Sequence, residues 1–150
     1  MPTGKTPLRS VNVIAADGST GRELLYQTDK GLDIQGWTTG GEAIVVRELL
    51  GPERQRLLLV PAGGGSHREL VALHGVVTSA DLSPDGQSVL VTRLVGEQHD
   101  FGLVDVATGA DRWVMSDRTD DHGAMWARDG QGVVFISDRT GCDALAFLPI

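Results

Sequence analysis

The chain of 150 residues contains little cysteine, few aromatic side chains and no long apolar run. Its single cysteine, Cys142, excludes an intramolecular disulfide, and we expect this thiol to be a small buried apolar filler rather than a reactive group. The longest apolar runs, such as 57–60, are far shorter than the roughly 20 residues of a membrane-spanning helix, so we expect no membrane insertion. The first residues contain no apolar segment typical of a secretory signal. The chain as given is therefore predicted to be cytoplasmic, with a periplasmic location as the alternative if a signal is missing from it.

Basic residues are also scarce, with 13 lysines and arginines against 20 aspartates and glutamates and a net charge of −7. No basic cluster offsets this balance, which argues against a nucleic-acid partner. Glycine, by contrast, is abundant at 20 residues, and 41% of the chain is hydrophobic. This combination is typical of a globular protein built from many short strands and tight turns.

Three segments of the chain resemble one another, namely 36–46, 81–91 and 125–135. Each has an apolar residue, a four-residue turn ending in glycine, and then a run of apolar residues. The first apolar residue recurs after 45 positions and again after 44. The turn glycine supplies the positive φ of a tight hairpin, and the β-branched residues that follow favour a strand. These features indicate a structural repeat of about 44 residues.

A second unit of strand, glycine turn and strand follows each of these segments, so that one repeat holds four short antiparallel strands, a to d. Such a sheet, repeated at this period, predicts an all-β propeller of about 3.4 blades, an incomplete or open ring. Trp37 and Trp126 occupy equivalent positions, which indicates packing between blades. The predicted organisation is an N-terminal tail at 1–10, strands c and d of a first blade at 11–29, full blades at 30–74 and 75–119, and a partial blade at 120–150.

The third repeat, through Leu82–Gly86 and Val104–Gly109, resembles the TolB-like (WD40-like, PD40) propeller repeat, which opens with W-S-P-D-G. The fourth repeat is similar through Trp126 and Ser137–Gly141. The resemblance extends over about residues 11–148 and implies a fold rather than a function. Propellers of this kind look like those of periplasmic TolB-like proteins, of prolyl-oligopeptidase-type serine peptidases, where they gate access, and of bacterial protein kinases, where they act as sensors.

Propellers close with roughly four to eight blades, more than this chain holds. Three explanations follow. The chain is a piece of a longer protein, which we favour; or it pairs with a second copy to close a ring; or it is an open array.

In a propeller, the a–b and c–d turns lie on one face, here called the turn face, and the b–c and d–a loops lie on the other, the loop face. The turn face carries the recurring glycine motifs, so we interpret it as structural. The loop face differs between repeats, and loops on a rigid scaffold are where binding residues usually lie. The candidate residues for binding a protein or peptide partner are Asp29, Lys30, Arg54, His74, His99, Asp117, Arg118, Asp120, Asp121, His122, Asp138 and Arg139.

No catalytic constellation is predicted, because Ser83 belongs to a structural turn, no G-x-S-x-G elbow is present, and Asp85 and Asp129 are turn caps. The acidic loop at 117–122 could offer oxygen ligands to a divalent cation, but it lacks the EF-hand spacing, so we interpret it as a solvated loop and predict no metal and no cofactor. The sequence thus favours a non-catalytic propeller module that binds a protein or ligand through its loop face. The alternative is the propeller portion of a larger enzyme or regulator.

Overall fold

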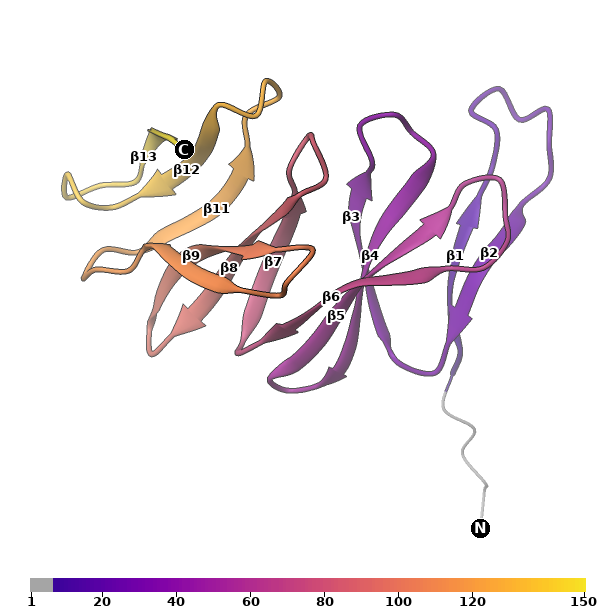
Figure 1. Cartoon of the computed structure of the whole chain (residues 1–150), viewed down its shortest axis with the longest axis horizontal. Coiled ribbons are helices and arrows are strands. Elements are labelled where there is room, and N and C mark those ends of the chain that lie inside the picture. Colours follow the sequence, from indigo (N-terminus) through magenta and orange to yellow (C-terminus); the bar gives the residue numbers. More distant parts are fainter. Residues whose placement is uncertain (1–6) are drawn as a thin grey trace, which may run out of the picture.

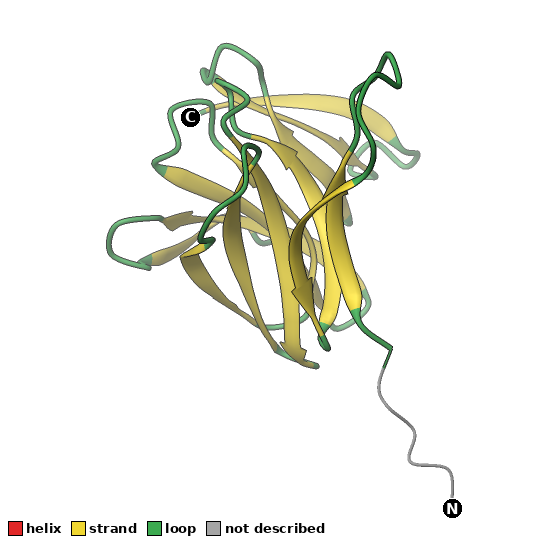
Figure 2. Cartoon of the chain, turned by 90° about the vertical axis from the view of Figure 1, so that its right-hand side faces the viewer, coloured by secondary structure: helices red, strands yellow, loops and turns green. Residues whose placement is uncertain are grey.

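The computed structural model describes residues 7–150, which form 13 β-strands in four antiparallel sheets and no helix (Figure 1). Figure 2 shows the same residues as strands joined by loops throughout. None of the described residues forms a helix that could span a bilayer. The predicted all-β architecture of four-stranded antiparallel sheets is confirmed. Residues 1–6 of the expected tail lie outside the described residues, and the first strand already begins at Arg9.

Two complete sheets lie between two smaller ones, and each sheet is taken here as one blade. The strands are β1 (Arg9–Val13) and β2 (Glu23–Thr28) in blade 1; β3 (Gly31–Trp37), β4 (Ala43–Gly51), β5 (Arg54–Pro61) and β6 (Arg68–His74) in blade 2; β7 (Val77–Leu82), β8 (Ser88–Val95), β9 (Gln98–Asp105) and β10 (Asp111–Met115) in blade 3; and β11 (Asp121–Trp126), β12 (Gly132–Ser137) and β13 (Ala144–Pro149) in blade 4. Blades 1 and 4 lie at opposite ends of the array (Figure 1).

The a–b turns are stabilised within themselves, as their sequence predicted. In blade 3, Asp85 Oδ1 accepts hydrogen bonds from the Gln87 amide and from the Ser83 hydroxyl, at 3.0 and 2.6 Å. Gly86 follows with a φ of +74°, a conformation that glycine adopts without steric cost. Asp129 accepts the equivalent amide hydrogen bond in blade 4, at 3.0 Å. These carboxylates are turn caps.

The core consists of three clusters, one between each pair of neighbouring blades. Val11 of blade 1 packs with Ile44 and Val60 of blade 2, and similar clusters join blade 2 to blade 3 and blade 3 to blade 4. The central strands are apolar on both faces because each face meets a different neighbour. Trp126 packs against the third cluster, as expected.

Several expectations about individual residues are wrong. Cys142 is exposed, because it follows the tight turn that protrudes between β12 and β13, where neither face of the blade can cover it. Trp37 is 55% exposed and belongs to none of the three core clusters. The b and c strands also extend until two residues connect them at 52–53 and 96–97, which shortens the expected loops. Candidates expected in loops lie in strands instead: Arg54 and His99 near the starts of c strands, His74 at the end of a d strand, and Asp121 and His122 at the start of an a strand.

Candidate binding face

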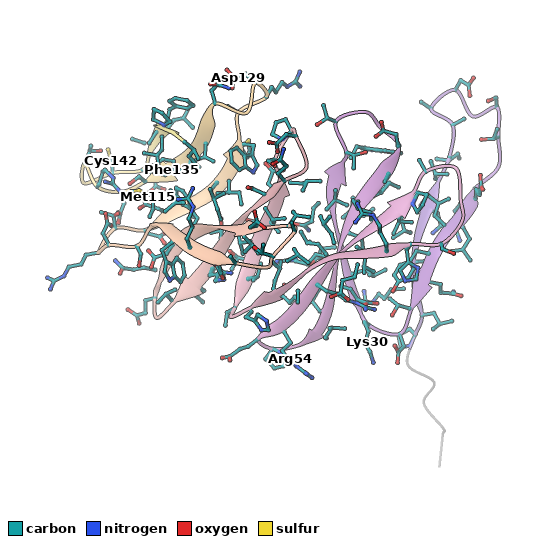
Figure 3. All side chains as sticks on the ribbon, in the orientation of Figure 1. Lys30, Arg54, Met115, Asp129, Phe135 and Cys142 are labelled. Carbon is teal, nitrogen blue, oxygen red and sulfur yellow. The ribbon has the colours of Figure 1, made fainter. Side chains whose placement is uncertain are left out.

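The candidate residues lie at the ends of strands or in the loops that join them. Figure 3 shows Lys30 and Arg54 at the lower edge, away from Asp129 of an a–b turn at the upper edge. The contacts divide the candidates into two groups. The first group joins blades 3 and 4 through His99, Asp117, Arg118, Asp120, Asp121, His122, Asp138 and Arg139. The second group, Asp29, Lys30, Arg54 and His74, belongs to the edges of blades 1 and 2.

Asp120 is the centre of the first group. Its Oδ1 accepts a hydrogen bond from the His99 backbone amide at 2.6 Å and lies 2.9 Å from His99 Nδ1. Its Oδ2 lies 3.2 Å from Nδ1 of His122. Partial burial would raise the pKa of Asp120, but the hydrogen bonds from His99 and the electrostatic attraction of the His99 and His122 rings outweigh it, so this pKa lies below its ordinary value. One carboxylate thus links β9 of blade 3 to β11 of blade 4.

Arg139 forms the second centre. Its Nη2 lies 3.0 Å from Oδ2 of Asp121, which is fully buried, and 3.4 Å from Oδ2 of Asp117. Hydrogen bonds from the hydroxyl and the amide of Thr119 lower the pKa of Asp117. The interpretation of 117–122 as a solvated acidic loop holds for the exposed Asp117 and Arg118 but not for the buried Asp121, and a cation 18 to 22 residues further along the chain pairs with both carboxylates. Among residues 7–150, no group of three or more His, Cys, Asp or Glu side chains is arranged to hold a metal ion.

The remaining candidates contribute differently. Asp29 and Lys30 form an exposed ion pair at 3.3 Å, and Arg54 is exposed at the start of β5. The backbone carbonyl of His74, rather than its ring, accepts a hydrogen bond from Nε of Arg93 at 2.9 Å.

A groove of about 540 Å³ lies beside the Asp29–Lys30 pair, and sequence reasoning missed it. Its apolar lining includes Leu49, Leu50 and Val76, which are 37%, 40% and 41% exposed. These residues come from the end of β4 and from the loop before β7, so the d–a and b–c loops of neighbouring blades build the groove together. The available signal was the apolar pair Leu49–Leu50, which follows the polar residues Arg47 and Glu48 near the end of β4.

A smaller hollow of about 310 Å³ lies on the turn face, between Pro84 of blade 3 and Trp126 of blade 4. The turn caps Asp85 and Asp129 line it, and their hydrogen bonds are made within their own turns. This hollow is therefore formed by residues of the structural turns. None of those turn residues lines the groove on the loop face.

Comparison with known proteins finds sequence similarity to a curated protein and structural similarity to solved structures. No protein-family profile matches the chain. The Tol-Pal system protein TolB of Wolinella succinogenes is 31% identical over 77 residues, which is 51% of this chain and 18% of that protein. Crystal structures of TolB from Acinetobacter baumannii (TM-score 0.71, 18% identity) and of oligogalacturonate lyase from Vibrio parahaemolyticus (TM-score 0.76, 12% identity) align with 94% and 93% of this chain.

The alignments span 35% and 41% of those two structures, so the chain spans well under half the length of the relatives it matches. The β-propeller domain of the Trilobed protease from Pyrococcus furiosus and a prolyl endopeptidase are also among the matched structures. At these identities the structural likeness establishes the fold, and the fold is shared by proteins with different activities. Taken with the sequence similarity to TolB and the repeated four-stranded sheets, it shows that this chain is a TolB-like β-propeller.

Proposed function

We propose that the chain is a non-catalytic binding module that receives a protein or peptide segment on its loop face. The observation that carries this proposal is the groove beside Asp29 and Lys30, where three large apolar side chains are exposed next to an ion pair. Peptide sites combine apolar anchoring positions with a polar rim in this way.

The chemistry of the groove suggests the kind of segment that fits it. Leu49, Leu50 and Val76 offer contacts to an apolar side chain, and Lys30 and Asp29 offer charges of both signs at one end. Gln55 also lines the groove, and its buried Oε1 has no hydrogen-bond partner among the described residues. An extended segment with one or two large apolar side chains and a polar flank matches these features. The similarity to TolB, a component of the Tol-Pal system, supports a protein partner in general terms.

Selection of peptides from a random display library on the immobilised chain tests the proposal. We expect the enriched peptides to carry apolar anchors, and we expect Leu50→Asp or Val76→Asp to weaken their binding about tenfold, because each change places a charge in the apolar lining. The matched control is Gln87→Asp, which adds the same charge at an exposed position of an a–b turn.

The control variant should bind the peptides as the unchanged chain does. Binding that is equally strong in all the variants, or that Gln87→Asp alone weakens, would contradict a site in the groove.

A second candidate function is that of a propeller portion of an enzyme or regulator. It is favoured by the match to a lyase and to peptidase propellers, and by the small share of each relative that the chain spans. The reading frame around the corresponding gene distinguishes the two candidates. A hydrolase, lyase or kinase domain encoded in the same frame supports the second.

The similarity to TolB favours a periplasmic location over the cytoplasmic one expected from the sequence, which gains no support. Release of the native protein from cells by osmotic shock, with a cytoplasmic enzyme as the control, tests this location.

A further inference from the structure

Two b–c hairpins of the loop face carry exposed apolar pairs. Leu49–Leu50 lies near the end of β4 in blade 2, and Leu94–Val95, 45 positions later, ends β8 in blade 3. These four side chains are between 36% and 48% exposed. The fold does not require them to be apolar, because the equivalent pair of blade 4, 44 positions further on, is Asp138–Arg139. Exposed apolar side chains that the repeat does not require indicate a surface for a partner.

Val76 joins the two hairpins. It lines the groove together with Leu49 and Leu50, and its backbone carbonyl accepts a hydrogen bond from the Leu94 amide at 2.9 Å. The apolar surface therefore continues out of the groove and onto blade 3. We call its five side chains the apolar stripe: Leu49, Leu50, Val76, Leu94 and Val95.

The stripe leads to a region with an excess of negative charge. Leu94 pairs across the strands with His99, whose Nδ1 lies 2.9 Å from Oδ1 of Asp120. Cross-strand partners project from the same face of a sheet, so Leu94 adjoins the contacts between blades 3 and 4. We call the segments 97–100, 117–122 and 138–139 the acidic end, because six carboxylates there face only two arginines: Glu97, Asp100, Asp117, Asp120, Asp121 and Asp138 against Arg118 and Arg139.

The opposite end of the stripe is balanced in charge. Asp29 and Lys30 pair there at 3.3 Å, and Glu53 and Arg54 follow one another at the tip of the β4–β5 hairpin. The negative charge of the loop face thus increases in one direction along the stripe, from blade 2 toward blade 4.

The buried carboxylate of Asp100 shows that the chain itself does not compensate this charge. Asp100 is 4% exposed, and its Oδ1 has no hydrogen-bond partner among the described residues. Ser116 donates to the other oxygen at 3.3 Å. Burial, and after it the negative charges of Asp117, Asp121 and Asp120, raise the pKa of this carboxyl. A buried acceptor without a donor is rare, and a cationic donor forms the strongest hydrogen bond with it.

We propose that the loop face binds a partner segment that has large apolar side chains at one end and lysine or arginine at the other. This inference rests on the proposed function and extends it, since it names the chemistry of the segment and its orientation. The apolar side chains lie along the stripe, and the cationic side chains lie at the acidic end beside Glu97 and Asp100. Apolar contact supplies affinity, while the charges fix the orientation and select against acidic segments.

Peptide selection on the immobilised chain tests this inference when the composition of the enriched peptides is the readout. We expect about twice as many lysines and arginines as in the unselected library, gathered on one side of the apolar anchors. Val95→Ser should weaken binding of the enriched peptides about fivefold, because it shortens the apolar stripe on blade 3. Glu97→Lys should weaken it about fivefold as well, because it reverses one charge of the acidic end.

The matched control is Glu53→Lys, which reverses the same charge at the equivalent hairpin position of blade 2, 44 residues earlier. It should weaken binding less than about twofold, because the cationic side chains lie on other blades. Circular dichroism melting of each variant reports that the blades are folded.

The outcomes separate this inference from the proposed function. If Leu50→Asp weakens binding but Val95→Ser and Glu97→Lys do not, or if the enriched peptides have no excess of basic residues, the groove binds a peptide and this inference is overturned. A selection that enriches no peptide overturns both. The inference is also overturned if light scattering shows that the chain is a dimer that Val95→Ser dissociates, since a second copy would then occupy the stripe.

Discussion

The ion pair between Arg139 and the buried Asp121 gives the sharpest prediction for stability. Arg139→Ala removes the guanidinium that lies 3.0 Å from a carboxylate with no exposed surface. Breaking a fully buried ion pair by removing one partner costs several kcal/mol, because the other charge is left uncompensated. The Arg139 side chain is 40% exposed, so water reaches the pair, and we expect the free energy of unfolding to fall by about 2 kcal/mol.

Urea denaturation followed by circular dichroism measures this change, and the melting temperature should fall by about 4–8 °C for a chain of this size. The control is Arg128→Ala, which removes an exposed cation from the a–b turn of the same blade and should have little effect. The double variant Asp121→Asn, Arg139→Ala should recover most of the lost stability, because it leaves no uncompensated charge. The reasoning is refuted if Arg139→Ala and Arg128→Ala are equally stable, or if the double variant is less stable than Arg139→Ala alone.

Three further predictions concern other blades. Tyr26→Phe should lower the free energy of unfolding by about 2 kcal/mol and speed hydrogen exchange in β1 and β2, because the hydroxyl donates a 2.6 Å hydrogen bond to the buried carboxylate of Glu48. Unchanged exchange in these strands would count against this prediction. Gly102→Ala should destabilise the chain by about 1–3 kcal/mol in urea, since the new Cβ would meet a carbonyl of β10 at 2.5 Å, whereas Gly51→Ala, with open space, should be tolerated. Burial raises the pKa of Asp81 above 3.8, so ionisation of this carboxyl lowers the stability of the chain as the pH rises through the raised value. Asp81→Asn should therefore raise the melting temperature at pH 7 and leave it unchanged at pH 3. Equal shifts at the two pH values would contradict this.

The repeat made most of the fold predictable from the sequence. Turn residues such as Asp85 and Gly86 act within a few positions of their partners, so their roles follow from local sequence, and the equivalent turns confirm one another. Strand ends were harder to predict. β4 runs on to Gly51 because its pairing with β5 continues after its apolar pattern ends.

The candidate site was less predictable, because its contacts join distant positions. The acidic loop could be interpreted only with Arg139 beside it, and that cation lies on the next hairpin. The groove needed Leu50 and Val76 from neighbouring blades, and neither residue carries a motif. Cys142 was misplaced because a lone thiol has no pattern that separates a hairpin loop from a core.

The division of the core into three interfaces between four sheets has a consequence for how the protein unfolds. A single shared core ties every element to every other, whereas here each blade is coupled to its immediate neighbours. Stability is then a sum of nearest-neighbour terms, as in a one-dimensional chain of linked units, and disruption can spread inward from either end. The loop-face groove is built by blades 1, 2 and 3, whereas the contact of Asp120 with His99 joins blade 4 to blade 3 and the pair of Arg139 with Asp121 lies within blade 4. The contacts at one end of the array can therefore loosen while those at the other end keep their arrangement, so the groove and the ion-pair cluster can be lost and restored separately.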